Sequence, residues 1–159
     1  MNDIKKLNVF DKKYGNSYSL LNGSITEASK EYFFSMLEYE KNDIYEAYHG
    51  SPNNDFYDEY IYPDNDGASL YKVNSPFLFL GHTHYNMLKK LSNTQLINPG
   101  SIGQPRDYNE PSFAVVDTNS NKVEMVRFTY NKKELIYYIN KYDVNNKYLN
   151  DILKRKKDD

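Results

Sequence analysis

Short apolar runs alternate with turn-forming residues through the middle of the chain, and this pattern predicts β-strands. The segments 44–48, 76–80 and 94–98 are rich in aliphatic, β-branched and aromatic residues. An Asn/Asp-rich loop at 51–67 separates the first two segments, and a short turn region at 85–93 separates the second from the third. We therefore expect three strands joined by polar loops.

A second apolar pattern predicts a β-hairpin later in the chain. Alternating apolar residues at 112–117 and 122–128 flank the turn sequence Thr-Asn-Ser-Asn at 118–121. These two strands are expected to build the scaffold rather than a site.

Helical periodicity marks both flanks of the strand region. Ser24 and Glu27 have the spacing of a capping box, and the amphipathic segment that follows predicts a helix through about Tyr39. Residues 131–157 contain two further amphipathic stretches, which predict two closing helices. The chain is thus expected to be a single mixed domain of the α/β or α+β class over residues 1–159.

All three histidines of the chain follow a predicted strand. His49 comes directly after the first, and His82 and His84 stand at i and i+2 after the second. In extended chain, i and i+2 point to the same side and lie about 6–7 Å apart at Cα, so both rings can face one cleft. A lone histidine is more often an ordinary surface or interior residue. Three imidazoles at strand ends instead indicate a site for a divalent metal such as Zn, Mn, Fe, Co or Ni.

The loop after the third predicted strand carries the next candidate chemistry. It begins at Asn98, contains two prolines and two glycines, and ends with Arg106 and Asp107. A rigid loop of this kind can present backbone N–H groups and a guanidinium fork to a phosphate. The alternative is a tight turn with a solvent-paired arginine.

Three motifs together resemble one known family. His-Gly at 49–50, Gly-His-Thr-His at 81–84 and Asn-Pro-Gly-Ser-Ile-Gly-Gln-Pro-Arg at 98–106 are similar in order and spacing to the calcineurin-like metallophosphoesterases. Within that superfamily they resemble the small bacterial and archaeal phosphodiesterases and phosphatases. The resemblance covers about residues 24–130.

The resemblance implies a fold, a cofactor and a reaction. The family has a β-sandwich flanked by helices that holds two divalent ions at strand ends, and a metal-bound hydroxide hydrolyses phosphate mono- or diesters. It assigns His49 and His82 to one ion and His84 to the other. It places Asn98, Arg106 and Asp107 at the substrate or behind the ligands. It identifies no catalytic residue beyond these.

The chain also departs from the family. The early family motifs D-x-H, G-D-x-x-D and G-N-H-[DE], which supply the bridging aspartate and further ligands, do not occur in the 159 residues. The sequence therefore resembles the later half of a metallophosphoesterase domain. Two cations about 4 Å apart repel unless an anion bridges them, so a two-metal centre is not expected from this chain alone.

Two classes of function follow from this departure. One is a metal-dependent phosphoesterase that is active as an assembled complex, by self-association or with a chain carrying the missing half, or that is a fragment of a longer gene product. The other is a non-catalytic remnant or interaction module of the same fold. The sequence does not reveal the substrate beyond a phosphate ester.

Composition limits the partners and the compartment. A formal charge of −2 disfavours a general nucleic-acid binder, and the absence of cysteine excludes disulfides and thiolate chemistry. No segment has the apolar length of a signal peptide or a membrane span, so a cytoplasmic protein is expected. The 17 tyrosines are spread along the chain, which indicates partial burial rather than a surface for stacking bases.

Overall fold

The computed structural model describes residues 24–53, 59–66, 70, 73–143 and 153. By their internal contacts the residues fall into two compact units. One comprises Met1–Met36 with Tyr130–Arg155, and the other comprises Leu37–Thr129 with Lys156–Asp159. Within the described ranges, no helix is both long and apolar enough to cross a bilayer.

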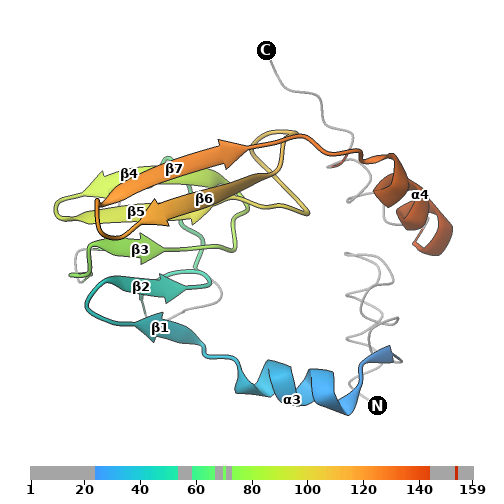
Figure 1. The fold of residues 1–159 in the computed structure, drawn as a ribbon, viewed down its shortest axis with the longest axis horizontal. Helices are drawn as coiled ribbons and strands as arrows, with labels where there is room; N and C mark the ends of the chain where they lie inside the picture. Colours follow the sequence, from blue (N-terminus) through green and yellow to red (C-terminus); the bar gives the residue numbers. More distant parts are fainter. Residues whose placement is uncertain (1–23, 54–58, 67–69, 71–72, 144–152, 154–159) are drawn as a thin grey trace. The chain divides into compact units, whose positions relative to one another are not determined.

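The second unit is built on a five-stranded sheet with the order β1-β2-β3-β5-β4 (Figure 1). Its strands are β1 Tyr39–Lys41, β2 Tyr45–Tyr48, β3 Phe77–Phe79, β4 Asn86–Leu91 and β5 Thr94–Pro99. The three central strands β2, β3 and β5 run parallel, whereas β1 and β4 pair antiparallel at the two edges. Parallel strands bring their carboxyl ends to one edge of a sheet, and that edge carries the candidate site.

The three predicted strands are confirmed, and two strands were not predicted. The region 85–93, expected to be a turn, contains β4, which is joined to β5 by the two residues Ser92 and Asn93. That prediction was wrong because Met87 is the one fully buried residue of β4 and Leu91 is only partly buried against the core, so the strand's apolar signal is weak. β1 was missed because all three of its residues are exposed.

The main apolar cluster of this unit lies on one face of the five-stranded sheet, and Phe77 and Ile97 are buried on the other face. Leu78 and Leu80 from the β3 segment, Leu96 from β5 and Met87 from β4 pack together with their side chains at most 4% exposed. Each such side chain stabilises the fold by about 1.5–3 kcal/mol when it leaves water. This packing fixes the level at which β3 and β5 end, and therefore the position of the loops that follow them.

The predicted hairpin is confirmed as a second, two-stranded sheet of β6 Ser112–Asp117 and β7 Lys122–Arg127. The Asp117 carboxylate closes its turn by accepting hydrogen bonds from Asn119 N and from the Ser120 hydroxyl. Ser112 ties β6 to the end of β5, because its Oγ donates to Pro99 O at 2.7 Å. Gly100 makes this close approach possible: its φ is +81°, and a Cβ there would lie 2.2 Å from Ser112 Oγ.

The first unit contains α3 Glu27–Ser35 and α4 Lys133–Tyr142. The predicted helix at the start is confirmed in type but is shorter than expected. Thr26, not Ser24, is the N-cap, and its side chain accepts a hydrogen bond from Ser29 N at 3.1 Å. The helix ends at Ser35 instead of Tyr39, because Tyr39 pairs with Tyr48 in the sheet and stacks on its ring.

One of the two predicted closing helices is present as α4, in which Ile139 is buried. The second closing helix and the chain opening before residue 24 lie outside the described residues, except for Leu153, which is buried. Within the described residues, two sheets and two helices make a mixed α+β fold, as the sequence predicts.

Candidate metal centre

The carboxyl ends of β2 and β3 place His49 and His82 beside each other. The two strands are parallel neighbours, and Gly81 N donates to His49 O at 2.9 Å just beyond them (Figure 1). Gly81 is the position of closest approach, since a Cβ there would lie 3.4 Å from His49 O. Sheet pairing thus carries two histidines, 33 residues apart in sequence, to one point.

The His49 and His82 rings face each other with their nitrogens in contact. His82 Nδ1 lies 2.8 Å from His49 Nε2, and the ring centroids are 4.7 Å apart. Two imidazoles on one cation, with metal–nitrogen distances near 2.0–2.1 Å, would hold these nitrogens about 3.0–3.4 Å apart. The pair would therefore admit a divalent ion after opening by a few tenths of an ångström. The proton of the hydrogen bond between His82 Nδ1 and His49 Nε2 would be released when the ion binds.

A backbone carbonyl fixes the orientation and the tautomer of the His84 ring. Its Nδ1 donates to the backbone carbonyl of Gln104 at 2.8 Å, because a carbonyl oxygen can only accept. The lone pair is then on Nε2, which is the arrangement that metal-binding histidines usually show.

The charge state of His84 suits the same role. Burial lowers the pKa of His84, the hydrogen bond to the Gln104 carbonyl raises it, and the electrostatic influence of the neighbouring Arg106 and His49 side chains lowers it further. Proton competition for this nitrogen is weakened, so the ring stays neutral near neutral pH. Only the neutral ring can bind a metal.

The Gly-His-Thr-His loop has a strained backbone that the surrounding structure fixes. His82 and His84 have positive φ values of 62° and 61°, which are uncommon for residues with a side chain. Thr83 between them is 1% exposed and points into the protein. Strain of this kind persists where neighbouring contacts impose it, and it is often found at functional sites.

Asn98 supplies the contacts that hold this loop. Its amide is fully buried, and Nδ2 donates to Gly81 O at 2.8 Å and to Thr83 Oγ1 at 3.0 Å. Its Oδ1 accepts from Gly100 N at 3.1 Å. All three bonds go to groups of the protein, so the Asn98 side chain holds the loop that carries His82 and His84.

Arg106 contacts the backbone of His84. Its backbone N–H donates to His84 O at 3.2 Å, and its guanidinium Nη2 donates to the Gln104 side chain at 3.3 Å. Its charge is close enough to affect the pKa of His84. A cation in this position can attract a phosphate toward the histidines.

Asp107 is engaged elsewhere. Its carboxylate forms an ion pair with Arg127, and it accepts from Asn86 N at 2.9 Å and Tyr108 N at 2.7 Å. Asp107 is 9% exposed, so these contacts use most of its surface. The carboxylate therefore links the strands around the loop and is not directed at the histidines.

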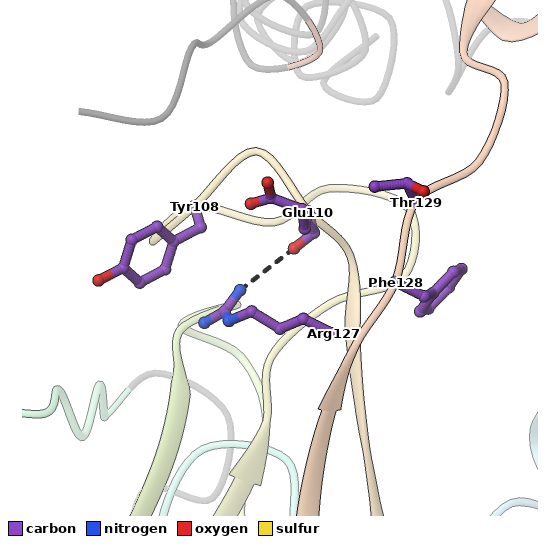
Figure 2. Close-up of a pocket in the computed structure, with 5 residues that line it drawn as sticks. All are labelled: Tyr108, Glu110, Arg127, Phe128 and Thr129. Atoms are coloured by element: carbon purple, nitrogen blue, oxygen red, sulfur yellow. Dashed lines mark hydrogen bonds between the residues drawn. The ribbon is translucent and has the colours of Figure 1, made fainter. Parts of the chain in front are cut away.

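Arg127 lines a separate surface hollow of about 430 Å³ (Figure 2). Its guanidinium lies between Tyr108 and Glu110, donates to the Glu110 carbonyl at 3.1 Å, and lies 4.5 Å from the centre of the Tyr108 ring. The positive charge is already matched by Asp107. This hollow is lined by none of the three histidines and is not part of the candidate centre.

The Asp107–Arg127 pair gives a prediction for stability against pH. Burial raises the pKa of Asp107, but the hydrogen bonds from Arg127, Asn86 and Tyr108 outweigh it and hold the pKa below its usual value of 3.8. The pair therefore stabilises the fold above pH 3.8, and that contribution is lost as the pH falls through the lower folded pKa.

We expect Asp107→Asn to lower the unfolding free energy at pH 7 by about 1.5–3 kcal/mol. The difference from the parent should shrink as the pH falls below 3.8, measured by urea denaturation at a series of pH values. A difference that stays constant down to pH 2 would contradict the assigned ion pair.

The histidines are not accompanied by a carboxylate cluster in the part of the chain that the structure describes. There, no group of three or more His, Cys, Asp or Glu side chains has the arrangement of a metal site. Asp55 and Asp58, acidic residues of the loop at 51–67, lie outside the described residues. The described donor set is thus the pair of imidazoles of His49 and His82; His84, two residues after His82, does not join them in a three-membered group.

Two contributors to the centre were not found from the sequence. The Gln104 carbonyl orients His84, and the Tyr60 ring lies 4.0 Å from the His82 ring between centroids. A backbone carbonyl has no residue-type signal. Tyr60 lies in a polar loop whose path only the tertiary structure fixes.

Comparison with known proteins places this arrangement in a family. Residues 22–121 match the model of the calcineurin-like phosphoesterase superfamily domain. An uncharacterised protein of Methanocaldococcus jannaschii is 31% identical over 103 residues, which cover 54% of this chain and 41% of that protein.

Two crystal structures have similar folds. A metallophosphoesterase from Sphaerobacter thermophilus has a TM-score of 0.66 at 23% identity, covering 75% of this chain and 59% of that one. A hypothetical protein from Pyrococcus horikoshii has a TM-score of 0.65 at 25% identity, covering 79% and 53%.

The chain thus spans between about two fifths and three fifths of the length of these relatives. The matched region includes all three histidines and the loop at 98–106. The chain therefore belongs to the calcineurin-like phosphoesterase superfamily.

Proposed function

We propose that this protein provides the histidine-rich part of a metal-dependent phosphoesterase. In this proposal His49, His82 and His84 bind divalent metal, and Arg106 binds the phosphate of a mono- or diester. The observation that carries it is the pair of facing nitrogens of His49 and His82 beside His84, whose orientation suits a ligand. The family suggests the same chemistry, metal-dependent hydrolysis of phosphate esters.

A bound divalent cation would supply an activated water and offset charge on the phosphoryl oxygens. The chain's own residues prepare the site for this. Gln104 fixes the tautomer of His84, and Asn98 fixes the loop that carries His82 and His84. The Arg106 guanidinium adds a positive charge beside them for the substrate.

Imidazole ligands are compatible with Mn, Zn, Fe, Co or Ni. Neutral ligands alone do not offset the charge of two neighbouring cations, so the proposal needs an acidic ligand that the described histidines do not supply. We assign it to a polypeptide segment carrying the D-x-H and G-D-x-x-D motifs on a partner chain, because these motifs do not occur in the 159 residues and a second copy of this chain would not supply them. The proposal also includes the expectation from the sequence that residues 1–159 form a single domain.

Two successive experiments test the proposal, first metal binding and then hydrolysis. The purified protein is stripped with a chelator and titrated with Mn²⁺ or Zn²⁺ by calorimetry. We expect binding that His84→Ala weakens. Hydrolysis of bis(p-nitrophenyl) phosphate should then appear when the metal-loaded protein is mixed with a chain carrying the missing motifs. Failure to bind any of these ions, or no hydrolysis by a stable mixed complex, would overturn the proposal.

A non-catalytic interaction module is the second candidate. It is favoured by one observation, that no three-membered ligand cluster occurs in the described part of the chain. This candidate predicts metal binding no tighter than that of isolated surface histidines. It also predicts that His84→Ala leaves the titration unchanged.

A further inference from the structure

A row of aromatic rings extends from the candidate metal centre. The His82 ring, which faces His49, lies 4.0 Å from the Tyr60 ring between centroids. Tyr60 stacks on Tyr62 at 6.0 Å with an angle of 9° between the ring planes, and Tyr62 meets the edge of Tyr85 at 5.4 Å. We call Tyr60, Tyr62 and Tyr85 the tyrosine row.

The row is open to solvent while its backbone is anchored. Tyr60 and Tyr62 are 45% and 38% exposed, and Ile61 between them is 2% exposed and lies in the core. Because alternate residues of extended chain point to opposite sides, burial of Ile61 turns both tyrosines outward. Tyr85 N donates to Thr83 Oγ1 at 3.3 Å, so the other end is fixed to the loop of His82 and His84.

Exposed rings in contact with a site are suited to one kind of ligand group. A flat heterocycle can stack on a tyrosine face, and every base has such a face, so binding of this type needs no base-specific hydrogen bond. The positive charge of Arg106 lies near His84, the residue before Tyr85. A molecule that carries both a phosphate and a planar ring can therefore place its phosphate at the histidines and stack its ring on an exposed tyrosine beside them.

We propose that the tyrosine row binds the base of a nucleotide ester whose phosphate lies at the histidines. The inference rests on the proposed phosphoesterase function and names its substrate class. The ligand is a mononucleotide rather than a nucleic acid strand, since the chain has a net charge of −2 and a strand would need a continuous basic track. Tertiary structure gathers three tyrosines that the sequence shows only as scattered residues.

The test compares three ligands that differ by one group at a time. Calorimetry measures binding of AMP, ribose 5-phosphate and inorganic phosphate to the Mn²⁺-loaded protein. AMP and ribose 5-phosphate share the same ester, so hydrolysis would affect both alike. We expect AMP to bind about 5- to 100-fold more tightly than ribose 5-phosphate, the range that one stacked base gives.

Three variants locate the effect. Tyr62→Leu should bring AMP binding close to that of ribose 5-phosphate and leave ribose 5-phosphate binding unchanged. Tyr62→Phe keeps a ring and should behave as the parent. Tyr39→Leu, which removes a 47% exposed tyrosine whose ring stacks on Tyr48, should also leave AMP binding unchanged.

Each outcome has a separate meaning. Equal binding of AMP and ribose 5-phosphate, or AMP binding unaffected by Tyr62→Leu, would overturn the tyrosine row while leaving the phosphoesterase proposal in place. Binding of none of the three anions by protein that has retained its metal would overturn both. Metal content of each variant, measured by elemental analysis, keeps loss of the ion distinct from loss of stacking.

Discussion

We expect Asn98→Ala to lower the unfolding free energy by about 3–5 kcal/mol and to weaken metal binding by about 10-fold or more. The side chain is 0% exposed and makes three hydrogen bonds within the protein. Alanine leaves the buried Thr83 Oγ1 and the partly buried Gly81 O and Gly100 N without these partners and adds a cavity. The metal effect follows because the loop of His82 and His84 loses its attachment to β5.

Two further variants separate the causes. Asn98→Asp keeps the shape and the acceptor for Gly100 N but replaces the donor with an oxygen, so it should be at least as destabilising as alanine. Gln95→Ala, on the same strand, removes an amide that donates to Asn121 O at an exposed position and should cost less than about 1 kcal/mol. Urea denaturation and metal titration give both readouts. Asn98→Ala with parent-like stability would show that these bonds do not fix the loop.

The second large effect is expected at His82. We expect His82→Ala to weaken divalent metal binding by roughly 100-fold or more, since each ligand of a multidentate site supplies a few kcal/mol of the binding free energy. His49 would then lack the partner whose Nδ1 lies 2.8 Å from its Nε2. Metal-dependent phosphoester hydrolysis should fall in parallel.

The φ of 62° at His82 calls for a matched variant. Alanine is strained in this region, whereas glycine adopts it without penalty, so His82→Gly removes the imidazole and retains the backbone conformation. Both variants should lose metal to a similar extent, as followed by calorimetry and by circular dichroism for folding. Tight metal binding by folded His82→Gly would exclude His82 as a ligand.

Much of the scaffold could be predicted from the sequence. The strands at 44–48, 76–80 and 94–98 and the hairpin carry dense apolar or alternating patterns, because their side chains build or cover a core. The exposed edge strand β1 and the half-exposed β4 lack such a pattern, and the sequence interpretation missed them. The helix start was misplaced by two residues because both Ser24 and Thr26 are capable caps, and local geometry selects between them.

The candidate site divides in the same way. The motifs around His49, His82 and Asn98 show the residue types of the site and their positions directly after strands. Because the carboxyl ends of parallel strands meet at one edge of a sheet, the sequence alone predicts that these residues come together. The 2.8 Å approach of two imidazoles comes from the parallel register of β2 and β3. The ion pair between Asp107 and Arg127 forms because β7, which ends at Arg127, brings the guanidinium beside the loop of Asp107.

The sequence by itself determined the family, the order of the central strands' motifs and the three imidazoles, because these depend on residue identity and local periodicity. The tertiary structure alone decided which groups touch. It turned Asn98 inward, gave His84 a carbonyl partner and aligned Tyr60, Tyr62 and Tyr85 beside His82. Contacts between segments distant in sequence depend on sheet register and on the burial of neighbouring side chains, and no local pattern encodes them.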